Sequence, residues 1–139
     1  MNYATVSDLV KLLPEETLVG LTDDDDLGVI NDKIVESALE TATVTIDGYL
    51  AGRYRLPLDP VPKIVTSLCV DLAGHLLFIR RDQNSEHWEM RQKNAIRFLE
   101  QLADGRLTLG ISEPSGTGDR ETLGVSAPEP QLTNELEKY

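Results

Sequence analysis

The chain has 139 residues, of which 40% are hydrophobic and 27% are charged, and this balance predicts one folded domain. Its formal net charge of −11 opposes a broad attractive surface for DNA or anionic lipid. No apolar run approaches the ~18 residues of a membrane helix and no signal-peptide pattern opens the chain, so we expect neither a membrane span nor a leader. The single cysteine, Cys69, excludes a disulfide within the chain.

Two short helices are predicted at the N-terminus. Thr5 and Asp8 have the spacing of a capping box, in which side chains and backbone groups satisfy each other at a helix start. Pro14 suits the first turn of a second helix, and Glu15 and Glu16 favour its N-terminal end. We expect the pair to form a small helical hairpin packed on the long helix that follows.

The acidic loop after this hairpin has part of the pattern of a calcium-binding loop. With Gly28 at the sixth position, Asp23 and Asp25 take the first and third ligand positions. Leu27 and Ile34 then occupy positions that require oxygen ligands, the second of them a bidentate glutamate. We therefore expect an exposed turn with a positive φ at Gly28 and no tight calcium site, with weak cation binding as the alternative.

The stretch from residue 31 to residue 58 predicts the longest helix, and we expect the rest of the chain to be organised around it. Arg53 and Arg55 favour its C-terminal end, where cations are stabilised. Pro57 is predicted to stop the helix, because the residue before a proline is driven out of helical dihedral angles. Apolar residues recur at intervals of three and four and form one face of the helix: Ile34, Val35, Ala38, Leu39, Ala42, Ile46, Tyr49 and Leu50.

Two further long helices are predicted, one starting near Pro62 or Lys63 and the other capped by Ser85. Asp71 and His75 lie four residues apart on the first of them. This spacing is typical of an ion pair on the helix surface or of a link to a neighbouring helix, and a metal site would need ligands that the sequence does not supply at matching positions.

The last helix is predicted to end at Gly105, which suits a left-handed C-terminal cap. Arg91 on its inner face is expected to contribute through its aliphatic stem. Leu107, Leu109 and Ile111 then alternate with small polar residues, as in a short strand or an extended arm.

The fold class predicted is all-α: three main helices plus a short N-terminal helical hairpin, with an extended C-terminal arm. We assign residues 1–110 to the helical domain and residues 111–139 to the arm, whose composition is too poor in apolar residues to fold alone. The sequence contains no phosphate loop, no paired Cys or His ligands and no Ser, His and Asp at a catalytic spacing. We therefore expect no enzyme, no cofactor and no metal.

The string IDGYLAGRYRLPL, from Ile46 to Leu58, carries the strongest resemblance to a known family. Together with Pro62, the triplet at residues 71–73 and GRLTLG at residues 105–110, it resembles a family of proteins from Mu-like bacteriophages and prophages, long catalogued as a domain of unknown function. The likeness covers residues 2–110 and leaves the tail without a family motif. By genomic setting and helical content, that family resembles the head-to-tail connector (adaptor, or head-completion) proteins of tailed phages.

The resemblance implies a structural protein of the virion, at the head–tail interface and assembled in the host cytoplasm. Such a protein docks on the portal protein, extends the DNA channel and contacts other connector or tail components. The resemblance also implies a homo-oligomeric ring, about twelve-fold, that encloses DNA without sequence-specific binding. The acidic composition suits passage of DNA, because a negative lumen repels phosphates.

Four residues of this string are candidates for a subunit or portal interface. Gly48 and Gly52 lie four apart and allow close approach of another backbone, and Arg53 and Tyr54 follow directly. The same residues also suit tight packing within one chain, with Arg53 paired to Asp47, and both interpretations stay open. We also expect the tail to become ordered only against a neighbouring subunit or the portal, through the anchors Leu123, Val125, Leu132, Leu136 and Tyr139.

Two other classes of function remain as alternatives. One is a small helical regulatory or DNA-associated protein of the prophage, which a basic recognition helix would favour. The basic residues of the last two helices are, however, interspersed with acids. The other is a calcium-binding module, which depends on the incomplete loop described above.

Overall fold

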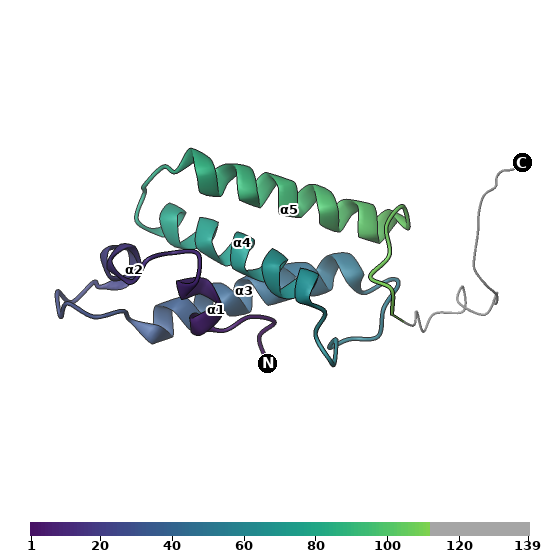
Figure 1. Ribbon diagram of the computed structural model, residues 1–139, viewed down its shortest axis with the longest axis horizontal. Helices are drawn as coiled ribbons and strands as arrows, with labels where there is room; N and C mark the ends of the chain where they lie inside the picture. Colours follow the sequence, from purple (N-terminus) through teal and green to yellow (C-terminus); the bar gives the residue numbers. More distant parts are fainter. Residues whose placement is uncertain (112–139) are drawn as a thin grey trace, which may run out of the picture.

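The computed structural model describes residues 1–111, and this part of the chain folds into five helices without a strand (Figure 1). The all-α prediction, with a helical hairpin before three long helices, is confirmed. The helices are α1 (Val6–Val10), α2 (Glu15–Thr22), α3 (Asp32–Leu50), α4 (Lys63–Arg80) and α5 (Glu86–Asp104).

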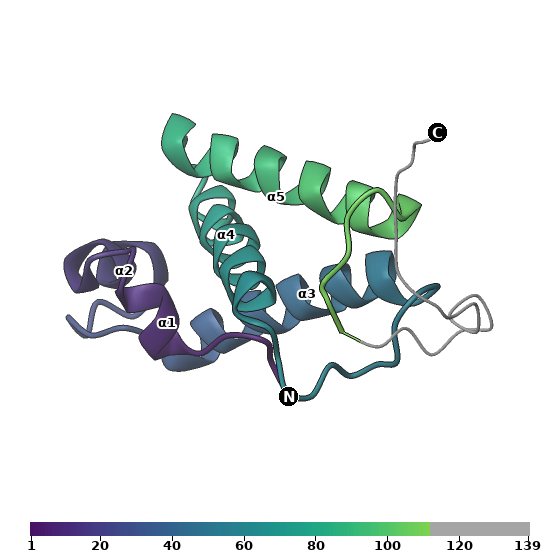
Figure 2. The ribbon, with the colours of Figure 1, turned by 45° about the vertical axis from the view of Figure 1, so that its right-hand side comes forward.

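The centre of the fold is α4, which contacts every other helix. Figure 2 shows it crossing between α3 on one side and α5 on the other, with α1 and α2 gathered at one end of the molecule. The expectation that the chain is organised around the segment 31–58 is therefore wrong. The physical reason lies in the width of the apolar face: α4 buries residues on nearly all sides of its helix, whereas α3 buries one stripe.

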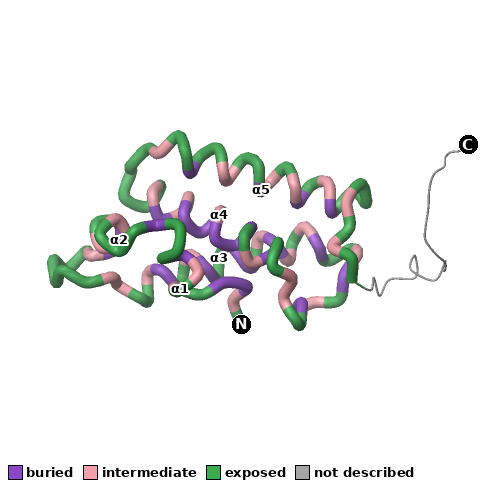
Figure 3. Tube along the Cα trace, in the orientation of Figure 1, coloured by how far each residue is buried: buried purple, intermediate pink, exposed green. Residues whose placement is uncertain are grey.

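The core is built mostly from leucine, valine and alanine, as the scarcity of aromatic residues requires. Figure 3 shows the buried residues concentrated along the facing sides of α3 and α4, with the outer side of α5 exposed. Two buried threonines satisfy their hydroxyls locally: Thr22 Oγ1 donates to the Leu18 carbonyl, and Thr43 Oγ1 donates to the Leu39 carbonyl. Cys69 is fully buried beside Thr43 and acts as a small core residue, as predicted.

Side chains predicted to cap helices do so. Thr5 and Asp8 form the reciprocal capping box at α1, and Ser85 accepts from the backbone N–H of Trp88 at α5. Gly105 ends α5 in the left-handed conformation, with φ of 84°. These caps depend on residues within one turn of each other, which explains why sequence spacing alone predicted them.

The third helix ends at Leu50, well before the predicted stop at Pro57. The backbone N–H groups of Arg53 and Tyr54 both donate to the Leu50 carbonyl and close a turn there. Tyr54 is 3% exposed, and its hydroxyl binds the segment after α5. The helix therefore ends seven residues before the proline, in a turn that carries the buried Tyr54.

The contact between α4 and α5 is built around Trp88. A Cβ atom at Gly74 would lie 2.3 Å from the Trp88 ring, so the indole packs directly on the backbone of α4. Phe78 stacks on the same ring, and the Arg91 guanidinium lies 5.1 Å from its centroid. The absence of a side chain at Gly74 therefore makes room for the largest residue of the core.

Arg91 also pairs with Asp71 across the two helices, with Nε 2.8 Å from Oδ1. The expectation that Arg91 contributes only its stem is wrong, because its guanidinium is held between the indole and a carboxylate. Asp71 links α4 to a neighbouring helix, which was one of the two alternatives for this residue. No helix within residues 1–111 is both long enough and apolar enough to cross a membrane.

Candidate protein interface

Residues of the string 46–58 meet the segment 107–111 at one end of the molecule (Figure 1). Arg53 Nη1 donates to the Leu102 carbonyl at 3.2 Å, and this oxygen in the last turn of α5 also accepts from the Gly105 backbone N–H. The Tyr54 hydroxyl accepts from the Leu109 backbone N–H at 3.0 Å and lies 3.3 Å from Thr108 Oγ1. These contacts set the direction in which the chain leaves the helical domain.

Gly105 is required beside Arg53 for two reasons. Its φ of 84° lies in the left-handed region, and a Cβ atom there would lie 2.7 Å from Arg53 Nη1. Arg53 therefore reaches the end of α5 over a bare backbone. The Asp47 carboxylate, one of the partners considered for Arg53, accepts from the Tyr3 hydroxyl at 2.6 Å.

Tyr3 joins the N-terminus to the same end of the fold. Its hydroxyl donates to Asp47 on α3 and accepts from the Leu58 backbone N–H at 3.0 Å. Its backbone groups bond to the hydroxyls of Thr43 and Thr66 on α3 and α4. Burial, together with the hydrogen bond to the Asp47 carboxylate, raises the pKa of Tyr3 to about 12.

Gly48 and Gly52 are exposed, one within α3 and one in the turn after it. No atom of the described residues, apart from the local backbone, lies within 4 Å of a Cβ built at either position. Packing within residues 1–111 therefore does not explain these two glycines. At these two positions the backbone of α3 and of the following turn is exposed to solvent. Val44, which is 64% exposed, lies next to them on the outer face of α3.

A hollow of about 220 Å³ lies beside this turn, and its floor is the buried side chain of Leu58. Three of its lining residues belong to the family string, and the two prolines with the leucine between them are the signal in the sequence that marks it. Its lining consists of Arg55, Pro57, Leu58, Asp59, Pro60 and Ile111.

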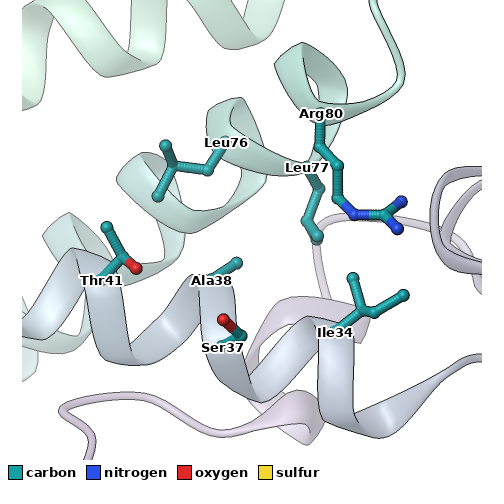
Figure 4. Close-up of a pocket in the computed structure, with 7 residues that line it drawn as sticks. All are labelled: Ile34, Ser37, Ala38, Thr41, Leu76, Leu77 and Arg80. Atoms are coloured by element: carbon teal, nitrogen blue, oxygen red, sulfur yellow. The ribbon is translucent and has the colours of Figure 1, made fainter.

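A second groove, of about 240 Å³, runs between α3 and α4. Figure 4 shows Ile34, Ala38 and Leu76 around it, while the guanidinium of Arg80 turns away from it. Arg80 instead donates to the Leu21 carbonyl and pairs with an aspartate of the acidic loop. The lining is mostly aliphatic, so this groove is suited to binding an apolar side chain.

The acidic loop uses two of its carboxylates within the chain. Both oxygens of Asp23 accept backbone N–H groups, from Leu27 at 2.8 Å and from Gly28 at 2.6 Å. Asp24 pairs with two arginines at the end of α4, and the hydrogen bond from Arg80 lowers the pKa of its carboxyl. The positive φ expected at Gly28 is confirmed, and the absence of a tight calcium site stays a prediction.

Within residues 1–111, no group of three or more His, Cys, Asp or Glu side chains is placed to hold a metal ion. The five tail anchors predicted at residues 123, 125, 132, 136 and 139 lie outside the described residues, and so does the arm itself. Of the predicted site residues, the structure thus brings Arg53 and Tyr54 together at the origin of the arm. It places Gly48 and Gly52 on the open face beside them.

Comparison with known proteins gives matches over most of the chain. The model of a family described as bacteriophage Mu Gp36 matches residues 3–126. A Mu-like prophage FluMu protein gp36 of Haemophilus influenzae is 38% identical over 87 residues, which cover 63% of this chain and 60% of that protein. Gene product J of Escherichia phage Mu is 32% identical over 140 residues, which cover 99% of this chain and 98% of that protein.

Proposed function

This chain belongs to the bacteriophage Mu Gp36 family, and from that membership we propose that it is a structural component of the virion, a head-to-tail adaptor. The resemblance to Mu-like phage proteins, based on the string from Ile46 to Leu58, is thereby confirmed. In the proposed role the protein docks on the portal protein, extends the DNA channel and contacts other connector or tail components.

The observation that carries the proposal is the open face around Gly48 and Gly52. The neighbouring residues Arg53 and Tyr54 are engaged within the chain, whereas the two glycines have no close neighbour in residues 1–111. Bare helix backbone next to an exposed valine is suited to close packing against another helix or another subunit. Packing of this kind is what a protein that works by assembly needs, and the proposal includes no catalytic residue and no cofactor.

We propose a closed ring of copies, about twelve-fold by the family resemblance, as the assembled form. A ring requires that each copy contact its neighbours through two different faces, because a contact between identical faces closes a dimer. In the proposed ring, residues 111–139 bind a neighbouring subunit or the portal. In this arrangement the ring encloses DNA without reading its sequence.

The alternative of a prophage regulatory or DNA-associated protein receives less support. Three of the basic residues form ion pairs: Arg80 and Arg81 share Asp24, and Arg91 pairs with Asp71. Binding to DNA phosphates gains affinity when Lys and Arg side chains displace the cations condensed on the DNA, and an arginine already paired with an aspartate is less available for this. The proposed function therefore relies on the acidic surface as a repulsive wall for DNA.

The test is a phage or inducible prophage in which the gene for this chain is interrupted. We expect filled heads and complete tails that fail to join, and recovery of joined particles when the gene is supplied from a plasmid. Electron microscopy of the particles would show a ring of this protein beneath the portal. Particles that join normally without the protein, or a single copy per particle, would reject the adaptor role.

A further inference from the structure

We propose that the acidic loop of one copy inserts Leu27 into the hollow beside Leu58 of the next copy, and that this contact repeats around the assembly. The inference rests on the proposed ring and names two different faces that would join its subunits. The first face is the loop at residues 23–30, and the second is the hollow at residues 55–60 together with Ile111.

The loop presents two apolar side chains to its surroundings. Leu27 is 70% exposed and Val29 is 57% exposed, whereas most leucines of the helical domain are buried. Isolated exposed apolar residues need no explanation, but two adjacent ones at the tip of a projecting loop mark a candidate contact. The loop lies at the extreme end of the long axis of the molecule in Figures 1 and 2.

The position of Leu27 is held by bonds within the chain. Its own backbone N–H donates to Asp23, and Asp24 is paired to the arginines that end α4. The loop closes where the Asn31 backbone N–H donates to Thr22 Oγ1 at 3.0 Å. Because these bonds already order the loop, insertion of Leu27 into a partner costs little further conformational entropy.

The hollow at the opposite end has the size and lining to receive one such side chain. Its volume of about 220 Å³ is below the ~300–1,000 Å³ of pockets for small ligands. Its apolar lining comes from two prolines, Leu58 and Ile111. The Leu58 backbone N–H donates to the Tyr3 hydroxyl, which fixes this residue to the N-terminal segment.

The charges of the two faces are complementary. Residues 23–32 contain five aspartates, of which Asp24 alone is paired with the arginines at the end of α4, whereas residues 53–63 contain three basic residues and one aspartate. Asp25 on the loop and Arg55 on the rim of the hollow are both exposed, and neither forms a hydrogen bond or ion pair within residues 1–111. Opposite signs at opposite ends favour a heterologous contact, in which the acidic end of one copy meets the basic end of the next.

A charge exchange in the full-length protein tests the contact, with assembly of joined particles as the readout in a host whose own copy of the gene is interrupted. We expect Asp25→Arg and Arg55→Asp each to reduce the yield of joined particles about tenfold or more, and the double exchange to restore much of it. Leu27→Ser should have a comparable effect. The matched control is Leu12→Ser, because Leu12 is also exposed, at 49%, but lies outside both faces.

Cysteine crosslinking provides a second measurement that reports proximity directly. The native Cys69 is buried, so a bis-maleimide reagent should not crosslink wild-type particles. A Leu27→Cys, Ile111→Cys double variant should yield a ladder of multimers, and each single variant should remain monomeric on denaturing gels. Dimers from Leu27→Cys alone would indicate a contact between identical faces and overturn the proposal.

The outcomes separate this contact from the proposed function. Normal incorporation of wild-type protein, with no ladder and no effect of the charge changes, would overturn the contact and leave the adaptor role standing. A ladder formed only when residues 112–139 are deleted would show that the tail fills the hollow in the complete chain, which also overturns it. Particles that join without any copy of the protein would reject the adaptor role and this contact with it.

Discussion

At the scale of single residues, glycines in the same kind of helix have opposite roles. Gly74 makes room for the Trp88 ring, whereas Gly20 on α2 has no atom within 4 Å of a built Cβ. A glycine in an open helical position destabilises the helix relative to alanine, while a glycine under an aromatic ring permits packing. Substitution by alanine therefore separates the two roles.

Gly74→Ala should lower the free energy of unfolding by about 1–3 kcal/mol, because the new methyl group forces Trp88 out of its position on α4. Gly20→Ala is the matched control and should be neutral or stabilising by up to ~1 kcal/mol. Urea unfolding followed by circular dichroism gives both values. Equal effects in the two variants would contradict the assigned role of Gly74.

Tyr3 predicts a pH dependence on the alkaline side. Its pKa is raised from 10.0 to about 12 in the folded protein, so the folded state holds the phenol proton more tightly than the unfolded chain. The stabilisation is complete below pH 10 and is lost as the pH rises from 10 towards 12. Tyr3→Phe removes the titration and also the bonds to Asp47 and Leu58, which costs ~1–2 kcal/mol at neutral pH.

Thermal unfolding between pH 9 and pH 12 measures this effect for the wild type and for Tyr3→Phe. The wild type should be more stable at pH 9, and the difference should shrink as the pH rises through the window from 10 to 12. A difference that stays constant across the window would show that Tyr3 ionises with the same pKa in both states.

At the scale of elements, the attachment of α5 to α4 combines apolar burial with one ion pair. Burial raises the pKa of the Asp71 carboxyl, and the charge of Arg91 opposes that rise. The pair thus offsets the cost of placing a carboxylate between two helices. Loss of one partner should be worse than loss of both.

Arg91→Met should lower the free energy of unfolding by about 1–3 kcal/mol at pH 7, because Asp71 is left partly buried without its cation. The double variant Asp71→Asn, Arg91→Met should be more stable than Arg91→Met alone. A raised folded-state pKa stabilises the protein only at low pH, so the two variants should converge as the pH falls through the pKa of Asp71. Urea midpoints at pH 7 and pH 4 test this, and a double variant weaker than the single one would refute it.

At the scale of the whole molecule, the described residues hold a continuous core between α3, α4 and α5. Leu107 and Leu109 pack against that core, and Ile111 lies at its edge with 39% exposure. The boundary between residues 110 and 111 stays a prediction. This placement leads to a prediction for a shortened chain.

Truncation after Ile111 should leave the helical circular dichroism unchanged and the thermal midpoint within a few degrees, because the five helices and the core they form in residues 1–111 are retained. Joining of heads to tails should be lost, because the removed segment carries the anchors predicted to bind a neighbouring subunit or the portal. Circular dichroism and complementation of the interrupted gene measure the two effects. A truncated chain that unfolds would show that the tail belongs to the core of its own domain.

The existence of the five helices, several of their caps and the family could all be predicted from the sequence. Periodicity, capping boxes and left-handed glycines depend on residues within one or two turns, and so Thr5, Ser85 and Gly105 were assigned correctly from spacing. The family string was recognisable for the same reason, as a run of adjacent residues. Local chemistry was sufficient wherever the partners are neighbours in sequence.

The tertiary structure alone decided where α3 ends, what Arg53 and Arg91 bind, and which glycines face outward. The contact of Arg53 with Leu102 joins residues 49 positions apart, and that of Tyr54 with Thr108 joins residues 54 positions apart. No local pattern encodes such pairs, because they form only when α3, α4 and α5 have packed and brought their ends together. The helix stops at Leu50 and not at the proline, and the buried Tyr54 in the turn that follows contacts the segment after α5.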